Sequence, residues 1–447
     1  MRVAFYTLGC KVNQYETAAM EQLFVSRGFS VVPHDGQAEV FVLNSCTVTA
    51  QGDRKSRQLL RRFRRRCPGA VIALCGCYPQ AFPEQAAQIA EADVVVGSKD
   101  RARLVELVRE RLCGGAARTV CISPHRREDG FEPLRVERFS ARTRATLKIQ
   151  DGCERFCAYC IIPFARGPVR SKPPGDLRGE LAGLSAAGYR EVVLVGINLS
   201  SYGQDLGLRL LDAVRAACDT PGIERVRLGS LEPELLTGED IRAMAALPGL
   251  CPQFHLSLQS GCDDTLRRMR RQYDTAQYRA IARELRAAFP GCAITTDIMV
   301  GFPGESDGEF AASLRFAREI AFAKAHVFAY SRRPGTAAAR MPGQVDEREK
   351  ALRARRMAEA TDTDRRAFFA AQVGERAPVL LETRLPDGRW QGHLPNYTPV
   401  VLYAPGAAPG DILQARILSC GDEHCEGEPA PEWIDNSLEI PNTQNWS

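Results

Sequence analysis

No stretch of the sequence approaches the roughly 18 consecutive apolar residues that a bilayer-spanning helix needs. The opening residues, MRVAFYTLGCKV, lack the basic start and apolar run of a secretory signal. No long internal repeat is present either. We therefore expect a soluble, cytoplasmic protein without a membrane partner.

The sequence also lacks a strong excess of charge of one sign: the net charge is only +5 and the pI is near 8.5. A soluble enzyme can show both values without binding nucleic acid, so the overall balance decides nothing. Hydrophobic residues make up 45% and charged residues 25%, which allows sizeable buried cores. A length of 447 residues predicts roughly two to four domains.

Cysteine, by contrast, is abundant, with 16 residues. Disulfide frameworks belong to small exported domains, so a long chain without an export signal does not fit one. In a reducing cytosol, clustered thiols more often bind metal or carry redox chemistry. We expect most of the 16 to be ordinary buried residues.

Residues 1–113 alternate short β-rich runs with amphipathic helical stretches, which predicts a doubly wound parallel sheet in an α/β domain. The expected strands are 3–8, 40–43, 71–74 and 94–96, and the expected helices lie near 15–27, 50–66, 80–91 and 100–112. Residues 114–138 are polar and without periodicity, and we interpret them as a linker.

Strands and helices alternate again in residues 139–370, followed by a β-rich segment, 371–434, and an irregular tail, 435–447. The central strands are expected at 146–151, 191–197, 225–231, 254–259, 293–301 and 325–330. Six successive parallel strands predict an open six-stranded (β/α) barrel, two units short of an eight-fold one. A charged helix is expected at 345–372, before β segments at 377–383, 389–394, 400–403 and 411–418. These predict a small barrel of about five strands, similar to an oligonucleotide-binding fold.

The run DGCERFCAYCIIP places Cys153, Cys157 and Cys160 in a C-x3-C-x2-C spacing. Three thiolates on one loop can bind three irons of a cubane cluster and leave the fourth iron open to a small molecule. The alternatives are a zinc loop or a chance cluster. Structural zinc needs four ligands, and no His or Cys follows closely enough to be the obvious fourth.

Three more cysteines follow the ends of three successive expected strands in the N-terminal domain. They are Cys10, Cys46 and Cys77. The carboxyl ends of parallel strands share one edge of the sheet, so these thiols are expected to converge. The adjacent Gly9 and Gly76 allow tight turns there. Cys75 competes with Cys77 as third ligand, but strand alternation points Cys75 into the sheet, so Cys77 is preferred.

The C-x3-C-x2-C loop, with Tyr159 before its last cysteine, resembles the radical SAM superfamily. Together, TLGCKVNQYE, NSCTVT, GCYPQ, DGCERFCAYCIIPFARG and the β-rich C-terminal module resemble the methylthiotransferase family over nearly the whole chain. That resemblance implies a 4Fe–4S cluster with S-adenosylmethionine on Cys153, Cys157 and Cys160. It also implies an auxiliary 4Fe–4S cluster on Cys10, Cys46 and Cys77, and an RNA-binding TRAM domain. Family members insert sulfur and a methyl group into a C–H bond, which requires an electron donor such as flavodoxin or ferredoxin and a sulfur donor.

Within the family, Lys11, Val12, Asn13 and Gln14 resemble the bacterial MtaB-type branch, which acts on N6-threonylcarbamoyladenosine at position 37, beside the tRNA anticodon. Two alternatives keep the chemistry: the isopentenyl-adenosine tRNA branch and the ribosomal-protein branch. An alternative of another class is a non-catalytic iron–sulfur protein that binds RNA or transfers electrons.

Residues at the expected strand ends of the barrel are candidates for binding the cofactor, because βα-barrel sites lie at that end. They are Gly196, Asn198, Glu232, Ser257, Gln259, Asp297 and Gly301, together with Tyr159. The alternative is that the glycines only form turns and that Asp297 only pairs in the core.

Basic and aromatic side chains give candidate RNA contacts. The segment 54–66 contains Arg54, Lys55, Arg57, Arg61, Arg62, Arg64, Arg65 and Arg66, and the C-terminal module contains Arg384, Arg389, Arg416, Trp390 and Tyr397. A solvated face is the alternative for the basic segment, and core packing is the alternative for the two aromatics. Arg166 and Arg170 lie where they could reach an RNA backbone or a substrate carboxylate.

Overall fold

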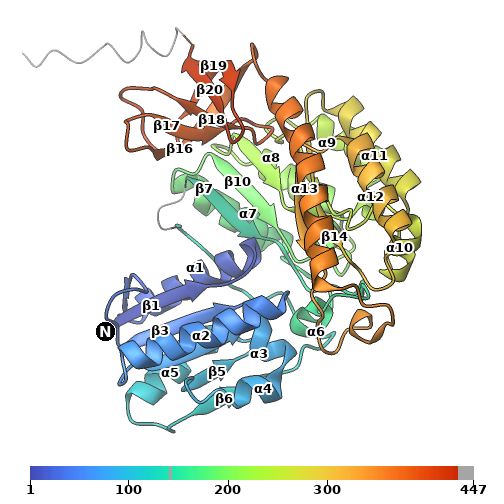
Figure 1. Ribbon diagram of the computed structural model, residues 1–447. Helices are drawn as coiled ribbons and strands as arrows, with labels where there is room; N and C mark the ends of the chain where they lie inside the picture. Colours follow the sequence, from blue (N-terminus) through green and yellow to red (C-terminus); the bar gives the residue numbers. More distant parts are fainter. Residues whose placement is uncertain (140–142, 431–447) are drawn as a thin grey trace, which may run out of the picture.

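A computed structural model describes residues 1–139 and 143–430 of the chain. It begins with a parallel sheet of six strands (Figure 1). In sheet order the strands are β2 (Ser30–Val32), β1 (Arg2–Thr7), β3 (Val40–Ser45), β4 (Val71–Gly76), β5 (Val94–Val96) and β6 (Thr119–Cys121). The expected doubly wound sheet is thus confirmed.

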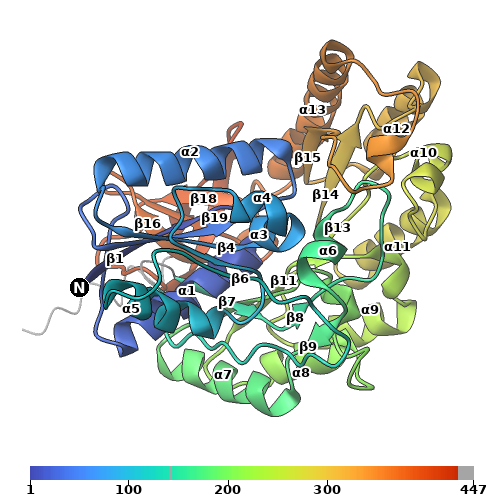
Figure 2. The ribbon, with the colours of Figure 1, turned by 90° about the horizontal axis from the view of Figure 1, so that it is seen from below.

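Helices cover both faces of this sheet because its strands are apolar on both sides, as in parallel sheets generally (Figure 2). Helices α1 (Lys11–Ser26) and α5 (Leu104–Leu112) pack on one face through side chains such as Phe24 and Leu104. On the other face lie α2 (Ala50–Arg66) and the short α3 (Cys77–Ala81) and α4 (Pro83–Ala87). The single helix expected at 80–91 is wrong, since Pro83 cannot extend α3 and starts α4 instead.

The expected linker 114–138 contains structure that the sequence prediction missed. Strand β6 lies within it and pairs in parallel with β5, so the sheet extends past residue 113. Further along, Leu134 and Val136 are buried in the central core. Three residues without a periodic pattern give no strand signal, which is why β6 and the equally short β2 were not predicted.

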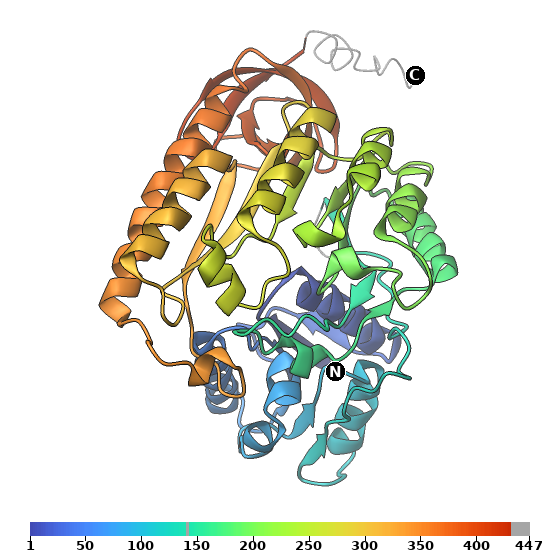
Figure 3. The ribbon, with the colours of Figure 1, turned by 90° about the vertical axis from the view of Figure 1, so that its right-hand side faces the viewer.

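The central region is an open arrangement of parallel strands, as expected (Figure 3). Its strands are β7 (Arg144–Lys148), β10 (Glu191–Val195), β11 (Arg225–Leu228), β12 (Ser230–Leu231), β13 (Gln253–Leu256), β14 (Ala293–Val300) and β15 (Lys324–Ala329). The third expected strand, 225–231, is interrupted at Gly229, so the hydrogen bonding divides into sheets β11-β10-β7 and β12-β13-β14-β15. Strands β7 and β15 do not pair, and the barrel is therefore open.

Helices cover the outside of this half-barrel. They are α7 (Pro174–Ala186), α8 (Leu210–Cys218), α9 (Gly238–Ala245), α11 (Thr275–Ala288) and α12 (Asp307–Ile320). Between β7 and α7 the chain forms β8 (Gln150–Asp151), α6 (Ile162–Arg166) and β9 (Arg170–Ser171), and α10 (Asp263–Arg268) precedes α11. None of the helices in the described part of the chain is long and apolar enough to cross a membrane.

The long helix α13 (Glu347–Ala370) leads into a closed five-stranded barrel. Its strands, in barrel order, are β16 (Arg376–Arg384), β17 (Trp390–His393), β18 (Pro399–Leu402), β20 (Cys425–Pro429) and β19 (Ile412–Cys420). Four of these strands correspond to the predicted segments. The tail 435–447 and the last residues of the segment 371–434 lie outside the described residues.

The C-terminal barrel docks on the N-terminal ends of the central strands, at the opposite end from the N-terminal sheet (Figure 1). Arg225 Nη2 donates to the Pro378 carbonyl at 2.5 Å, and Arg227 Nη1 donates to the Pro395 carbonyl at 2.8 Å. Arg144 pairs with Glu382 at 2.6 Å. Arginines at the starts of β7 and β11 thus fix the C-terminal barrel at the N-terminal end of the central open barrel.

Candidate active site

The cysteine loop after β8 is shaped by a glycine at its first bend. Gly152 has φ +79°, and a Cβ there would lie 1.7 Å from the Pro168 carbonyl oxygen. The Cys153 amide donates to Gly167 O at 2.9 Å, and the Cys160 amide donates to Cys157 O at 2.9 Å. These bonds fold the loop so that its three cysteines lie together at the carboxyl ends of the barrel strands.

The thiols of this loop are enclosed, and one of them faces a cation. Burial raises the pKa of Cys153 to about 11 and that of Cys160 to about 12. Arg271 Nη1 lies 3.3 Å from Cys157 Sγ and also pairs with Glu232. Metal binding requires thiolates, so loading a cluster here must release protons.

The three N-terminal cysteines converge, as predicted. A Cβ on Gly9, beside Cys10, would lie 3.0 Å from Cys46 Cβ. Burial, together with the neighbouring Cys77 and Cys10, raises the pKa of Cys46 to about 12. Cys75 instead packs in the core under α1, with its sulfur 4.0 Å from Met20 Sδ. The geometry favours Cys77 over Cys75, while the role of each cysteine as a ligand stays a prediction.

The spacing of the donor atoms can be compared with what a single ion and a cluster require. Over residues 1–139 and 143–430, no three His, Cys, Asp or Glu side chains are close enough to hold one metal ion. A cubane binds each thiolate through a different iron, so its ligands are spread more widely. Gly76, with φ +99°, brings the turn before Cys77 against Asn44 and Ser45, where a Cβ would lie 2.5 Å from both.

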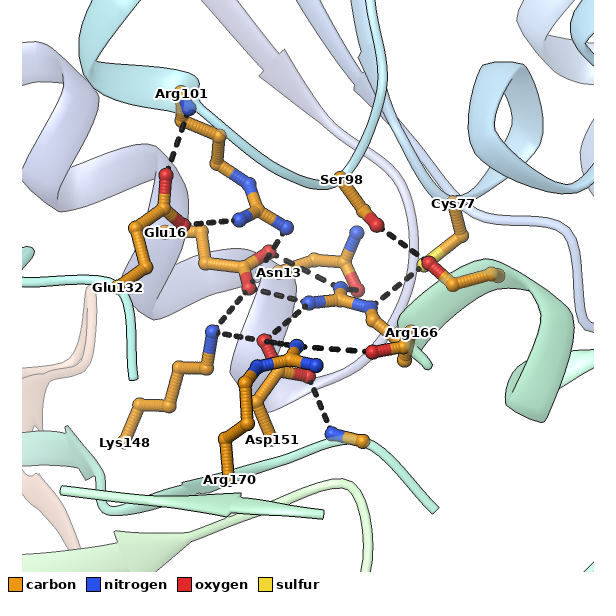
Figure 4. Close-up of polar contacts among 12 residues, drawn as sticks. Asn13, Glu16, Cys77, Ser98, Arg101, Glu132, Lys148, Asp151, Arg166 and Arg170 are labelled. Carbon is orange, nitrogen blue, oxygen red and sulfur yellow. Dashed lines mark hydrogen bonds and ion pairs between the residues drawn. The ribbon is translucent and has the colours of Figure 1, made fainter. Parts of the chain in front are cut away.

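A buried charge network surrounds Arg166, on the helix that follows the Cys153–Cys160 loop, and reaches Cys77 of the N-terminal triplet (Figure 4). Arg166, on α6 behind the first loop, is fully buried, and its Nε donates to Cys77 Sγ at 3.2 Å. Its Nη2 donates to Glu16 Oε2 at 3.1 Å and to Asn13 Oδ1 at 3.3 Å. Asn13 Oδ1 in turn accepts from Cys10 Sγ at 3.3 Å. The guanidinium therefore anchors α6, which follows the loop of Cys153, Cys157 and Cys160, against the site of Cys10 and Cys77.

Glu16 is the centre of that network. Besides Arg166, it pairs with Lys148 at 2.7 Å and Arg101 at 3.0 Å. Burial alone would raise the pKa of Glu16, but the three cations lower it to about 2. Asp151 pairs with Lys148 at 2.6 Å and lies 3.5 Å from Arg166. Sequence reasoning missed Glu16, Arg101 and Lys148, and it named Arg166 as a residue that could reach RNA or substrate, whereas the structure buries it completely.

Arg170 is also not free for RNA. Only 5% of the residue is exposed, and its Nη2 donates to the Arg166 carbonyl at 2.9 Å and lies 3.7 Å from Asp151. Both arginines are taken up by the seam between the N-terminal sheet and the barrel.

Two of the expected cofactor-binding residues have unsatisfied polar atoms. Asn198 Oδ1 and Gln259 Oε1 are buried and accept no hydrogen bond within the described structure. The Asn198 amide donates to Gln150 Oε1 at 2.8 Å, and Gln259 has φ +67° at a bridge to β14. Buried polar groups without partners are uncommon, so both are suited to meeting a bound molecule.

The remaining candidates divide between the site and the scaffold. Gly196 approaches Gln150, where a Cβ would lie 2.7 Å from its Oε1, and Ser257 O accepts from Tyr273 at 2.5 Å. Asp297 lies inside the barrel, 3.5 Å from His255 Nε2. Tyr159 packs edge-on against Phe302 in a small apolar cluster. Gly301 has φ +69° and its amide donates to Glu305 at 2.6 Å, as in the turn-forming alternative. Contact between these residues and the cofactor stays a prediction.

A cavity of about 730 Å³ extends through the open barrel to α1 and the C-terminal barrel; we refer to it as the lumen cavity. Its lining brings together residues from all three parts of the chain. They include Cys10, Lys11, Gly196, His255, Asp297, Lys324, His326, His393 and Tyr397. The cavity thus reaches from one predicted cluster ligand into the barrel.

The expected RNA contacts have different surroundings. On α2, Arg64 pairs with Asp93 at 2.6 Å and Arg61 with Glu91 at 3.2 Å. Four exposed cations of this helix have no ion pair or hydrogen bond to any described residue, and we refer to them as the α2 basic face. They are Arg54, Lys55, Arg62 and Arg65.

The aromatics of the C-terminal barrel are not open stacking platforms. Trp390 is 4% exposed and lies in the small core, as the alternative held. The Tyr397 ring stacks on His393 at 4.6 Å and lies beneath the guanidiniums of Arg144 and Arg227. Arg389 is paired with Asp387 and Glu426, whereas Arg384 and Arg416 are exposed.

Known proteins share this arrangement. Residues 2–97 match the uncharacterized protein family UPF0004, and residues 147–317 match the radical SAM superfamily. The threonylcarbamoyladenosine tRNA methylthiotransferase MtaB of Bacillus subtilis is 37% identical over 95% of this chain and 96% of its own. The chain belongs to the radical SAM methylthiotransferase family.

Other relatives of this methylthiotransferase fall in two branches. MtaB of Thermotoga maritima is 35% identical over 94% of this chain and 95% of its own. A tRNA-2-methylthio-N(6)-dimethylallyladenosine synthase from Sphingopyxis alaskensis is 34% identical over 95% of this chain and 96% of its own. In structure, the radical S-adenosylmethionine methyltransferase TsrM from Kitasatospora setae matches with a TM-score of 0.56 at 15% identity, over 75% of this chain and 73% of TsrM. That likeness confirms the fold alone. Family membership implies S-adenosylmethionine and a 4Fe–4S cluster, and it supports a second cluster.

Proposed function

We propose that this enzyme adds a methylthio group to C2 of N6-threonylcarbamoyladenosine at position 37 of tRNA. The observation that carries the proposal is the fully buried Arg166, which lies on the helix that follows the loop of Cys153, Cys157 and Cys160 and donates to Cys77 of the other triplet. Methylthiolation needs a radical source and a sulfur source acting on one carbon, and two cysteine sites fixed to one seam suit that requirement. The relatives named MtaB at 35–37% identity support the choice of nucleoside.

Cys153, Cys157 and Cys160 would hold the cluster that binds S-adenosylmethionine, and Cys10, Cys46 and Cys77 the auxiliary one. When bound, the first cluster and S-adenosylmethionine supply a radical able to take hydrogen from an unactivated C–H bond. The protein binds the cofactor and the substrate, orients them, and excludes water from the site. Arg271, 3.3 Å from Cys157 Sγ, holds a positive charge beside the first triplet, and Arg166 does the same beside Cys77.

Asn198 and Gln259 would orient the cofactor, since each has a buried oxygen without a donor. Glu232, fixed by Arg271, and Gly196, Ser257 and Asp297 remain proposed contacts at the same end or inside the barrel. An electron donor such as flavodoxin or ferredoxin and a sulfur donor are implied partners, and we expect the reaction in the cytoplasm.

The anticodon stem-loop would contact the α2 basic face and the C-terminal barrel. The four exposed cations of α2 have no acidic partner to compete with phosphates, in contrast to Arg61 and Arg64 on the same helix. Phosphate binding by such cations is independent of sequence and positions the RNA.

Nucleoside mass spectrometry tests the proposal. A deletion strain should accumulate threonylcarbamoyladenosine without its methylthio group, and the wild-type gene should restore it. Loss of methylthio-isopentenyl-adenosine instead would favour the isopentenyl-adenosine tRNA branch. Unchanged tRNA together with an altered ribosomal protein would favour the ribosomal-protein branch. The Cys153→Ala, Cys157→Ala, Cys160→Ala variant should retain about half the iron. A non-catalytic iron–sulfur protein would release no 5′-deoxyadenosine from S-adenosylmethionine.

A further inference from the structure

The lumen cavity has the size and composition of a small-molecule site. Its volume of about 730 Å³ lies within the roughly 300–1,000 Å³ typical of ligand pockets. Cys10 and Lys11 of α1 form one wall, strands β13 to β15 form another, and His393 and Tyr397 of the C-terminal barrel close one end. A modified nucleoside in this space would lie beside a predicted ligand of the auxiliary cluster.

The charged groups lining the cavity leave two cations without partners. Glu423 lies 3.5 Å from Arg365, and Asp297 lies 3.5 Å from His255. Lys11 and Lys324 have no ion pair or hydrogen bond with any residue that the structure describes. Since the acids in the lining already face bases, an anionic ligand would find both lysines available.

These groups face one another across the lumen. Burial lowers the pKa of His326, and Lys324, His255 and Lys11 lower it further, while Asp297 opposes them. All of these side chains line the lumen cavity with His326, although they come from α1, β13, β14 and β15. His393 and His424, at the end formed by the C-terminal barrel, pair with Glu382 and Glu426.

Lys11 has the more positive surroundings of the two lysines. It is the first residue of α1, whose first turn contains no acid and whose N-cap, Cys10, makes no capping bond. The amide groups at such a helix start favour a negative charge. No acidic side chain pairs with Lys11 within the described residues, so a bound anion would be its counter-ion.

We propose that Lys11 binds the carboxylate of the threonylcarbamoyl group when the modified adenosine occupies the lumen cavity. This inference rests on the proposed function and names the contact that selects its substrate. An isopentenyl group has no charge, and it would leave Lys11 without a counter-ion. Sites that pair with a polar substrate group reject analogues that lack it, because the site's own group is then left unpaired.

The test pairs a protein change with a substrate change. Reconstituted enzyme is assayed on anticodon stem-loops carrying threonylcarbamoyladenosine, or the same nucleoside with its carboxylate converted to a carboxamide. A hydrogen bond between two charged groups predicts that wild-type kcat/KM falls about 10–100-fold on the carboxamide. Lys11→Met should lose a similar factor on the carboxylate stem-loop and should discriminate between the two by less than about 3-fold. Lys11→Arg should retain discrimination.

Two controls separate this contact from general effects. Arg267→Met removes an exposed surface cation of α10, 74% accessible at its side chain, and should leave the wild-type ratio intact. Lys324→Met removes the other partnerless cation of the cavity. If Lys324→Met abolishes discrimination while Lys11→Met keeps it, or if Lys11→Met slows both substrates equally, the assignment to Lys11 is overturned. The Kd for each stem-loop, from fluorescence anisotropy, should show the same ratio.

Failure of the inference is distinguishable from failure of the proposed function. A wild-type enzyme that methylthiolates both stem-loops equally would overturn the role of Lys11 while leaving the reaction established. A wild-type enzyme that cleaves S-adenosylmethionine but modifies neither stem-loop would overturn the proposed substrate and the inference with it.

Discussion

Replacing Arg166 by methionine should loosen the seam between the N-terminal sheet and the barrel. The change removes the hydrogen bond to Cys77 and leaves Glu16 and Asp151 buried with one cation fewer. Breaking a buried ion pair costs about 3–5 kcal/mol, because a desolvated charge loses its partner. Glu16 keeps Arg101 and Lys148, and Asp151 keeps Lys148, so we expect the lower end, about 3 kcal/mol.

Native-state hydrogen exchange of the cluster-free protein measures this change locally. Amides of α3 and α6, the helices that meet at the seam, should exchange about 100-fold faster in the variant, which is the factor that corresponds to about 3 kcal/mol. Arg166→Lys should give exchange rates between those of the wild type and Arg166→Met, because lysine keeps the positive charge but lacks the planar guanidinium group. Arg135→Met breaks an exposed pair with Asp176 and should cost less than about 1 kcal/mol. If Arg166→Met perturbs these amides no more than Arg135→Met, the network does not hold the seam.

Three further predictions concern the loop, a histidine and the RNA face. Gly152→Ala should prevent iron incorporation, because the added Cβ would collide with the Pro168 carbonyl. The control is Gly188→Ala, which also has positive φ but open space around the added Cβ. It should incorporate iron normally and lower the free energy of unfolding in urea by about 1 kcal/mol. In the folded protein, burial and, second, the nearby Arg170 lower the pKa of His125 from 6.5 to about 4. The free energy of unfolding therefore keeps its full value above pH 6.5 and decreases as the pH falls from 6.5 to 4, where the folded state resists protonation of this ring. Unfolding measured from pH 7 to 4 should lose up to about 3 kcal/mol from this group, and His125→Gln should flatten that slope. Changing the four cations of the α2 basic face to glutamine should lower the slope of log K against log salt for stem-loop binding by about 3, and an unchanged slope would exclude this face from RNA contact.

The sequence was sufficient for features that depend on local patterns. Cys75, within β4, was separated in the sequence from Cys77, which follows the strand; the structure agrees, because Gly76 at φ +99° ends β4 between them and leaves Cys75 in the core. The C-x3-C-x2-C loop and the open barrel follow in the same way from spacing and from strand–helix alternation. The failures were short or interrupted elements: β2 and β6 are three residues each, and Gly229 divides the third barrel strand.

The charge network could not be predicted because it depends on contacts between distant segments. Glu16 lies 150 residues from Arg166 in the sequence, and Lys148 lies 132 residues from Glu16. An arginine shortly after a cysteine motif carries no sign that it will be buried, and we named it as a residue that could reach RNA or substrate. Lys11 was recognised only as part of a branch motif, and its position on the lumen cavity emerged from the fold.

The buried network also suits the proposed use of cysteines on two folding units in one reaction. Productive geometry requires reacting groups to be held within about 0.5 Å, which loops alone do not provide. An apolar seam could be as stable, but apolar contacts tolerate sliding, whereas hydrogen-bonded ion pairs have fixed directions. Glu16 comes from α1, Lys148 from β7 and Arg166 from α6, so a shift of either unit breaks several bonds at once. Burying these charges costs desolvation energy that stability alone would not require. A seam that must keep the two sites aligned accounts for that cost.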